Sequence, residues 1–150
     1  MSFFEAAYSA VIGIEAGFTK DARDPGNWTG GSVGLGELKG TKGGISAAAY
    51  PHLDIENLKP EDIKELYRRD YWARSGCETM SWERALCAFD CCVNQGEGAE
   101  QLLNSHAADA TELMTQRALR YAHTKNFDLD GHSWMHRLFI IFKAAQRTPS

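Results

Sequence analysis

Residues 11–18 read VIGIEAGF, and they place one glutamate where the surrounding pattern requires an apolar side chain. A stripe with intervals of 4, 3, 4 and 3 residues, typical of one face of an α-helix, runs through this stretch. Its members are Phe4, Tyr8, Val11, Glu15 and Phe18. The pattern predicts a first helix over residues 2–17 that ends at Gly17. A carboxylate on a buried stripe is costly unless it is paired, protonated or functional, so Glu15 needs an explanation.

Two interpretations of Glu15 are open from spacing alone. Burial penalises the charged form of a carboxylic acid and raises its pKa. A carboxylic acid with a raised pKa donates a proton near neutral pH, which is the task of a general acid. In the other interpretation Glu15 pairs at the helix end with a cation such as Lys20 or Arg23.

Residues 19–44, TKDARDPGNWTGGSVGLGELKGTKGG, contain eight of the fourteen glycines. This composition predicts a set of turns, either as a loop or with a short β-hairpin. Connections of this length in a small domain are usually functional. The spacing does not match a phosphate-binding loop, because GTK at 40–42 lacks the Gly-Lys-Ser/Thr ending.

Helical patterns dominate the rest of the chain, which we interpret as one mainly α domain over residues 1–150. The expected helices cover residues 46–50, 59–76, 81–96, 98–107, 109–125 and 132–146. Pro51 ends the first of these helices, and Asp109 or Thr111 caps the fifth. Ser133 is the expected cap of the last helix.

The composition argues against nucleic-acid binding and against a membrane-spanning protein. The net charge is −4, and the lysines and arginines are scattered, whereas a nucleic-acid binder concentrates them on one face. No apolar run approaches the roughly 20 residues that cross a bilayer. The N-terminus has no basic segment and contains Glu5, so it does not resemble a secretory signal. We therefore expect a protein made in the cytoplasm, without nucleic acid or stable membrane insertion. A monomer is the expected oligomeric state, although no sequence feature indicates it.

The cysteines and histidines do not predict a metal site. Three of the four cysteines cluster between residues 87 and 92, and we expect free buried thiols. Cys87 and Cys91 are one helical turn apart, but no second ligand pair has a familiar spacing. His132 and His136 are also one turn apart. The zinc-peptidase pattern requires glutamate after the first histidine, where this chain has Ser133, so a surface pair is expected.

Four segments occur in a specific order: IEAGFTKDARDPGNWTGG, GTKGGIS, LYRRDYW and AFDCCVNQG. Together they resemble the lysozyme-like muramidases of glycoside hydrolase family 108, which are phage endolysins and related bacterial proteins. The resemblance covers about residues 8–98 and continues weakly through GHSWMHRL. It implies a lysozyme-like α-helical fold and cleavage of the β-1,4 bond after N-acetylmuramic acid in peptidoglycan. It also implies cell-wall lysis after release, with no cofactor.

The resemblance assigns catalytic roles to three residues. Glu15 matches the family's catalytic glutamate, Asp24 matches the aspartate of Asp-Pro-Gly, and Thr41 matches the threonine before Gly-Ile-Thr. Glycoside hydrolysis needs an acid that protonates the leaving oxygen and a partner that orients water or balances charge on the sugar. Glu15 fits the first role, and Asp24 and Thr41 are candidates for the second. Asp24 has a structural alternative, because aspartate before proline forms turns.

Four further residues are candidate substrate contacts. Trp28 is a loop aromatic that suits stacking on a sugar. Ser46 either lines the site or caps the following helix. Asp90 and Asn94 share one side of a helix. This pair either binds a sugar or N-acetyl group or forms a buried polar tie. The expected partners of such a tie are Arg68, Arg69 and Tyr71.

The chain departs from the family at two motifs and carries an insertion between them. EAGF replaces Glu-Gly-Gly-Tyr, and TKGGIS replaces Thr-Asn-Phe-Gly-Ile-Thr. These changes leave other functions open. One is a lytic transglycosylase, since a single glutamate can act first as acid and then as base. Others are a non-catalytic lysozyme-like module that binds a glycan or a protein, and a zinc amidase or peptidase.

Overall fold

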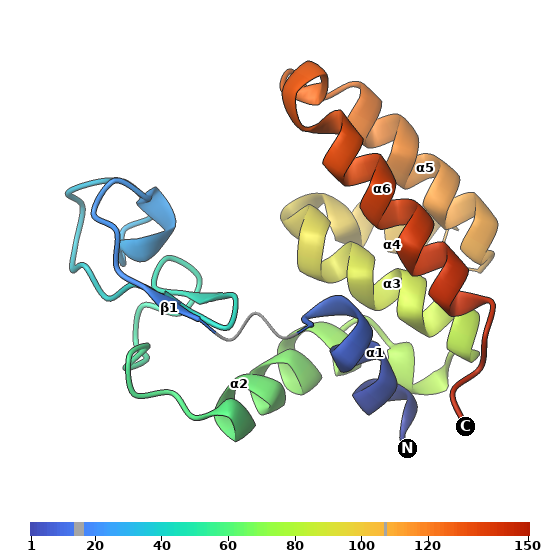
Figure 1. Ribbon diagram of the computed structural model, residues 1–150, viewed down its shortest axis with the longest axis horizontal. Coiled ribbons are helices and arrows are strands. Elements are labelled where there is room, and N and C mark those ends of the chain that lie inside the picture. The colour runs from blue at the N-terminus through green and yellow to red at the C-terminus, as the bar shows by residue number, and fades with distance from the viewer. Residues whose placement is uncertain (14–16, 107) are drawn as a thin grey trace. The chain divides into compact units, whose positions relative to one another are not determined.

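The computed structural model describes residues 1–13, 17–106 and 108–150 (Figure 1). They form two compact units. The helical unit comprises Met1–Val11 and Tyr67–Ser150, and the glycine-rich unit comprises Ile12–Leu66. The mainly α fold class is confirmed, with a small antiparallel sheet after the first helix. The expectation of one domain over residues 1–150 stays a prediction.

Helices of several types make up most of the chain. The α-helices are α1 (Phe3–Val11), α2 (Pro60–Tyr67), α3 (Trp82–Gln95), α4 (Ala99–His106), α5 (Ala110–Ala122) and α6 (Phe127–Ala145). A π-helical segment, η2 (Arg68–Ala73), continues α2, and η1 (Pro25–Asn27), η3 (Cys77–Thr79) and η4 (Gly96–Gly98) are short 3₁₀ turns. Within the described ranges, no helix combines the length and the apolar character needed to cross a bilayer.

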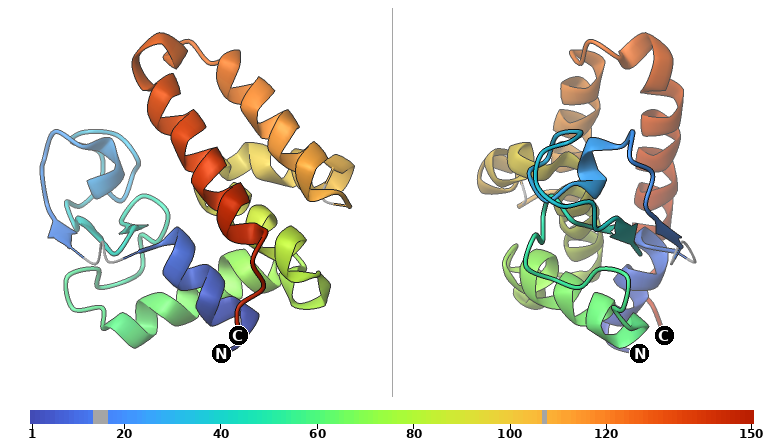
Figure 2. Two further views of the ribbon diagram at one scale, coloured as in Figure 1. Left: turned by 45° about the vertical axis from the view of Figure 1, so that its right-hand side comes forward. Right: turned by 90° about the vertical axis from the view of Figure 1, so that its left-hand side faces the viewer.

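Helix α3 forms the centre of the helical unit. It contacts α1, α4, α5 and α6 (Figure 2). Residues 85–91 are all buried, as expected for a helix that is covered on every side. Phe89 on α3 packs against Phe4 and Trp72, with the rings of Trp72 and Phe89 5.6 Å apart. Edge-on aromatic pairs of this kind contribute about 0.5–1.5 kcal/mol beyond their buried area.

The first helix ends earlier than predicted. Helix α1 ends at Val11 instead of Gly17, and Gly13 adopts the left-handed conformation with φ of +63°. A left-handed residue cannot continue a right-handed helix, and glycine takes this conformation at little cost. Phe4 and Val11 are buried as the stripe predicted, but Phe18 lies in a strand and is exposed. The periodicity through Phe18 was therefore misleading.

Two other helix predictions were wrong. Residues 47–49 form a turn instead of a helix, because Pro51 leaves too few residues to offset the cost of helix nucleation. Helix α6 begins at Phe127, six residues before the predicted cap Ser133. The helix includes Gly131, which is a poor helix former. A Cβ at this glycine would lie 2.7 Å from the Phe127 ring, so close packing accounts for the glycine.

The glycine-rich unit contains a three-stranded antiparallel sheet in the order β1 (Phe18–Thr19), β2 (Thr41–Lys42) and β3 (Ile45–Ser46). The two-residue turn between β2 and β3 is Gly43-Gly44, with φ of +55° and +79°. Two positive φ values are what a tight hairpin turn needs, which is why glycine occupies both positions. The short hairpin predicted for this segment is confirmed.

Candidate active site

The expected catalytic glutamate, Glu15, lies outside the described residues, and so do residues 14 and 16. The chain is described again from Gly17. The carbonyl of Gly17 accepts a hydrogen bond from the Gly43 N–H at 3.3 Å. The turn of the β2–β3 hairpin is thus tied to the residue two positions after Glu15. From Gly17 onward the structure describes the geometry of the other candidates.

Asp24 begins the turn η1. Its Oδ1 accepts a hydrogen bond from the Gly26 N–H at 2.8 Å, and its backbone is extended, as in a helix N-cap. This is the turn-forming role that the Asp-Pro sequence predicted. Asp24 is exposed, so its carboxylate is also accessible to solvent. A catalytic role for Asp24 stays a prediction.

Asn27 connects the η1 turn to β2, a role that no sequence pattern indicated. The side chain is fully buried. Its Nδ2 donates to the Asp21 carbonyl at 3.0 Å, and its Oδ1 accepts from the Thr41 hydroxyl at 2.7 Å. Its own carbonyl accepts from the N–H groups of Lys39 and Gly40, each at 3.0 Å. Asn27 thereby fixes both ends of the long glycine-rich excursion.

Thr41 lies on β2, half-buried and opposite Thr19 and Ser46 on the neighbouring strands. A threonine hydroxyl has one proton and two lone pairs. Since the proton is donated to Asn27, the oxygen can still accept a hydrogen bond from a water molecule. A water molecule that donates a hydrogen bond to Thr41 Oγ1 keeps both of its own lone pairs, so its oxygen can still interact with another atom.

The other two predicted contacts in this unit have structural partners. Ser46 Oγ accepts from the Ala49 N–H at 3.3 Å, so it closes a turn and does not cap a helix. The Trp28 indole N–H donates to the Ala22 carbonyl at 2.9 Å. Trp28 is half-buried, which leaves part of its ring accessible. Substrate contact by Trp28 or Ser46 stays a prediction.

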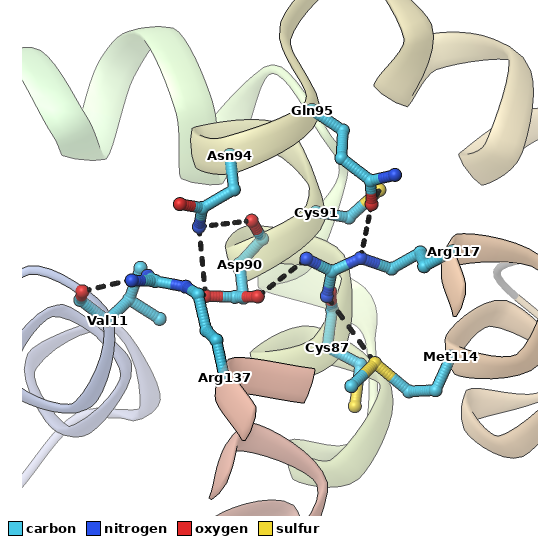
Figure 3. A network of polar contacts seen from close by, with 9 residues as sticks. All are labelled: Val11, Cys87, Asp90, Cys91, Asn94, Gln95, Met114, Arg117 and Arg137. Carbon is cyan, nitrogen blue, oxygen red and sulfur yellow. Dashed lines mark hydrogen bonds and ion pairs between the residues drawn. The ribbon is translucent and has the colours of Figure 1, made fainter. Parts of the chain in front are cut away.

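Asp90 in the helical unit is the centre of a buried polar network (Figure 3). Its Oδ2 accepts from Arg117 Nη2 at 2.7 Å, and its Oδ1 accepts from Arg137 Nε at 2.9 Å. Asn94 Nδ2 also donates to Oδ1, at 3.0 Å, which confirms that Asp90 and Asn94 share a side of the helix. Asp90 is fully buried, whereas Asn94 is exposed. The geometry favours the buried polar tie for Asp90, but with Arg117 and Arg137 in place of the expected partners.

Arg117 was not among the predicted site residues, although the sequence contains a signal for it. Ala110, Leu113, Met114 and Arg117 have helical spacing on α5, and all four are buried. A charge on an apolar stripe is the same anomaly as Glu15. Arg117 also donates to the Gln95 side chain. Arg137 reaches the Val11 carbonyl at 3.0 Å, a contact between α6 and α1 that no local pattern indicates.

The sequence profile of the family described as glycosyl hydrolase 108 matches residues 8–96, more than half of the chain. The chain belongs to the glycosyl hydrolase 108 family. No curated protein and no solved structure matches it. Membership of this family supports a hydrolase that binds a glycan and has a peptidoglycan-hydrolysing, lysozyme-like function. The matched span contains all seven predicted site residues, but Arg117 and Arg137 lie beyond it.

Burial and charge set the chemistry around the Asp90 network of this family member. Burial acts to lower the pKa of Arg117, but the Asp90 carboxylate and other partners outweigh it and raise the pKa. Burial raises the pKa of Cys87 to about 12 and that of Cys91 to about 11. These thiols are therefore protonated near neutral pH, and we assign them to the core. Among the residues that the structure describes, no group of three or more His, Cys, Asp or Glu could hold a metal.

Replacing the buried asparagine tests how the glycine-rich unit of this glycosyl hydrolase is held together. Asn27→Ala removes the acceptor of the Thr41 hydroxyl and the donor to Asp21. We expect the free energy of unfolding to fall by about 1–3 kcal/mol, measured by urea denaturation. Asn57→Ala is the matched control, since Asn57 is exposed and its side chain donates to Asp54 at the surface. Equal stability of the two variants would show that Asn27 does not organise this unit.

Proposed function

We propose that this glycosyl hydrolase 108 member is a muramidase that hydrolyses the β-1,4 bond between N-acetylmuramic acid and N-acetylglucosamine in bacterial peptidoglycan. Glu15 acts as the general acid. The observation that carries the proposal is the family match over residues 8–96, which spans Glu15, Asp24 and Thr41. The alternatives of a transglycosylase, an amidase or a non-catalytic module are left as outcomes of the test below.

Chain connectivity supports placing Glu15 and Thr41 in one site. Glu15 precedes Gly17 by two residues, and two residues of extended chain span at most about 7 Å. Gly17 is hydrogen-bonded to Gly43, which follows Thr41 by two residues. Strands β1 and β2 also pair Thr19 directly with Thr41. The segment that bears Glu15 therefore leads directly into the strand beside Thr41.

In the proposed reaction the Glu15 carboxyl gives its proton to the glycosidic oxygen, and the bond from that oxygen to the sugar C1 breaks. A water molecule, donating one hydrogen bond to Thr41 Oγ1, adds to C1 through its free lone pair. The exposed Asp24 carboxylate either takes up the proton that the water loses, or balances the positive charge on the sugar while the Glu15 carboxylate takes that proton back. The products are two shortened glycan strands, one with a reducing N-acetylmuramic acid.

The biological setting belongs to the same proposal. The protein is synthesised in the cytoplasm as a monomer and acts on the cell wall after release, as a bacteriophage endolysin does. Cleavage of the glycan strands then lyses the cell, which would make the protein antimicrobial towards cells whose wall it can reach. Substrate contacts by Trp28, Ser46, Asp90 and Asn94 are also proposals.

Mass spectrometry of fragments from purified peptidoglycan tests the proposed bond. We expect soluble fragments that end in reducing N-acetylmuramic acid. Fragments ending in 1,6-anhydro-N-acetylmuramic acid would identify a lytic transglycosylase, and newly free peptides would identify an amidase. Binding to peptidoglycan without any fragment would instead support the non-catalytic module.

A further inference from the structure

The helical unit has an open hollow of about 380 Å³ between the end of α1 and the middle of α6. Its lining residues are Ala10, His132, Ser133, His136, Arg137, Ile140 and Ile141. Four of them carry N–H or O–H donors, and none carries a carboxylate. The lining thus combines hydrogen-bond donors with aliphatic carbon. This combination suits a small anionic group attached to an apolar one.

Arg137 gives the hollow a positive charge. The Asp90 network contains two guanidinium groups and one carboxylate, so it carries a formal charge of +1. Arg117 is fully buried, whereas the side chain of Arg137 is 36% exposed. The positive charge of the network is therefore accessible to solvent at Arg137. Among the described residues, Arg137 uses Nε and Nη2 on Asp90 and Val11, and its Nη1 has no acceptor. Because its other N–H groups are already bonded, the Arg137 guanidinium is fixed in orientation, and its Nη1 can donate to an oxyanion.

The two histidines add further donors beside this charge. His132 and His136 are one turn apart on α6, with ring centroids 6.0 Å apart and planes within 9° of parallel. Both residues are exposed, and Ser133 beside them is also exposed. Every histidine ring carries at least one N–H donor in either protonation state. The hollow therefore presents a guanidinium, two imidazoles and a hydroxyl on a chain whose net charge is −4.

We propose that this hollow is a carboxylate-binding subsite for the stem peptide of peptidoglycan, an inference that rests on the proposed function. Arg137, His132, His136 and Ser133 hold the carboxylate. The terminal alanine of the stem peptide places a methyl group next to its free carboxylate, and this methyl group packs on Ile140 and Ile141. The subsite selects peptide-bearing glycan strands.

The position of the hollow along the chain fits this role. Ala10, which lines it, and Val11, which bonds Arg137, precede Glu15 by five and four residues. The hollow and the proposed acid are therefore close in sequence. The N-acetylmuramic acid residue that bears the stem peptide is also the sugar whose bond is cleaved.

Binding of the full-length protein to purified sacculi of a Gram-negative bacterium tests the subsite, since these sacculi carry peptide carboxylates but no teichoic-acid phosphate. Ser133→Asp places a negative charge in the hollow at an exposed position. We expect the dissociation constant at low salt to rise roughly threefold to tenfold. Ser2→Asp is the control, because it adds the same charge at the exposed N-cap of α1, where aspartate is also a favoured cap.

Sacculi whose carboxylates have been converted to amides separate charge recognition from other effects. On these sacculi the wild type and Ser133→Asp should bind equally, and more weakly than the wild type binds native sacculi. The double variant His132→Ala/His136→Ala, which removes both ring N–H donors from exposed positions of α6, should show the same pattern, with unchanged circular dichroism. Equal affinities of wild type and Ser133→Asp for native sacculi would overturn the subsite, and so would a difference that persists after amidation. Because binding and not cleavage is measured, failure of the muramidase proposal is seen separately in the fragment analysis.

Discussion

Glu15→Gln is expected to lower the rate of peptidoglycan hydrolysis at least ~100-fold, the usual share of general-acid catalysis. Glutamine keeps the size and shape of the side chain but has no acidic proton to give to the glycosidic oxygen. The rate is measured as the loss of turbidity of outer-membrane-stripped cells or purified sacculi. Binding to sacculi should survive, because the exchange removes a proton and leaves the fold unchanged.

Glu78→Gln is the matched control for this variant. Glu78 is exposed in the turn η3 of the helical unit, and we expect its replacement to leave the rate unchanged. Equal lysis by wild type and Glu15→Gln would remove Glu15 from the mechanism. Absence of hydrolysis by the wild type itself, with binding retained, would contradict the enzyme and favour a binding module.

The parts of the fold that the sequence predicted correctly depend on local signals. The cap of α5 was expected at Asp109 or Thr111, and it is Asp109, whose Oδ1 accepts from the Glu112 N–H at 2.9 Å. The hairpin at Gly43-Gly44 follows from the need for two positive φ values. Helix α3 was expected from its apolar stripe and its closing Gly96. In each case a few neighbouring residues contain all the required information.

The errors and omissions have a different origin. Periodicity continued past Gly13 only because Phe18 happens to have helical spacing, although it lies in β1. Asn27 was missed because its partner Thr41 is 14 residues away, and Arg137 because Asp90 is 47 residues away. No local pattern encodes such contacts. The burial of Arg117 could have been predicted, because a charged residue on an apolar stripe indicates a buried ion pair even when the partner is unknown.

Asp90→Asn is expected to reduce the free energy of unfolding of the helical unit by about 3–5 kcal/mol. Both carboxylate oxygens face N–H donors, from Arg117 on one side and from Arg137 and Asn94 on the other. The amide of asparagine would point its own N–H₂ at one of these donors and would leave the fully buried Arg117 without a counter-charge. Urea denaturation followed by tryptophan fluorescence reports this unit, because Trp72 and Trp82 are buried in it.

A double-mutant cycle shows whether the loss comes from the uncompensated charge. Arg117→Met removes the buried cation, and Arg137 can turn its partly exposed guanidinium to solvent. Asp90→Asn should therefore cost at least about 1 kcal/mol less in the Arg117→Met background than in the wild type. Glu83→Gln, an acid-to-amide exchange at the surface of the same helix beside Gln146, should cost less than about 1 kcal/mol. Strictly additive effects of the first two substitutions would mean that Asp90 matters for packing and not for holding the charge of Arg117.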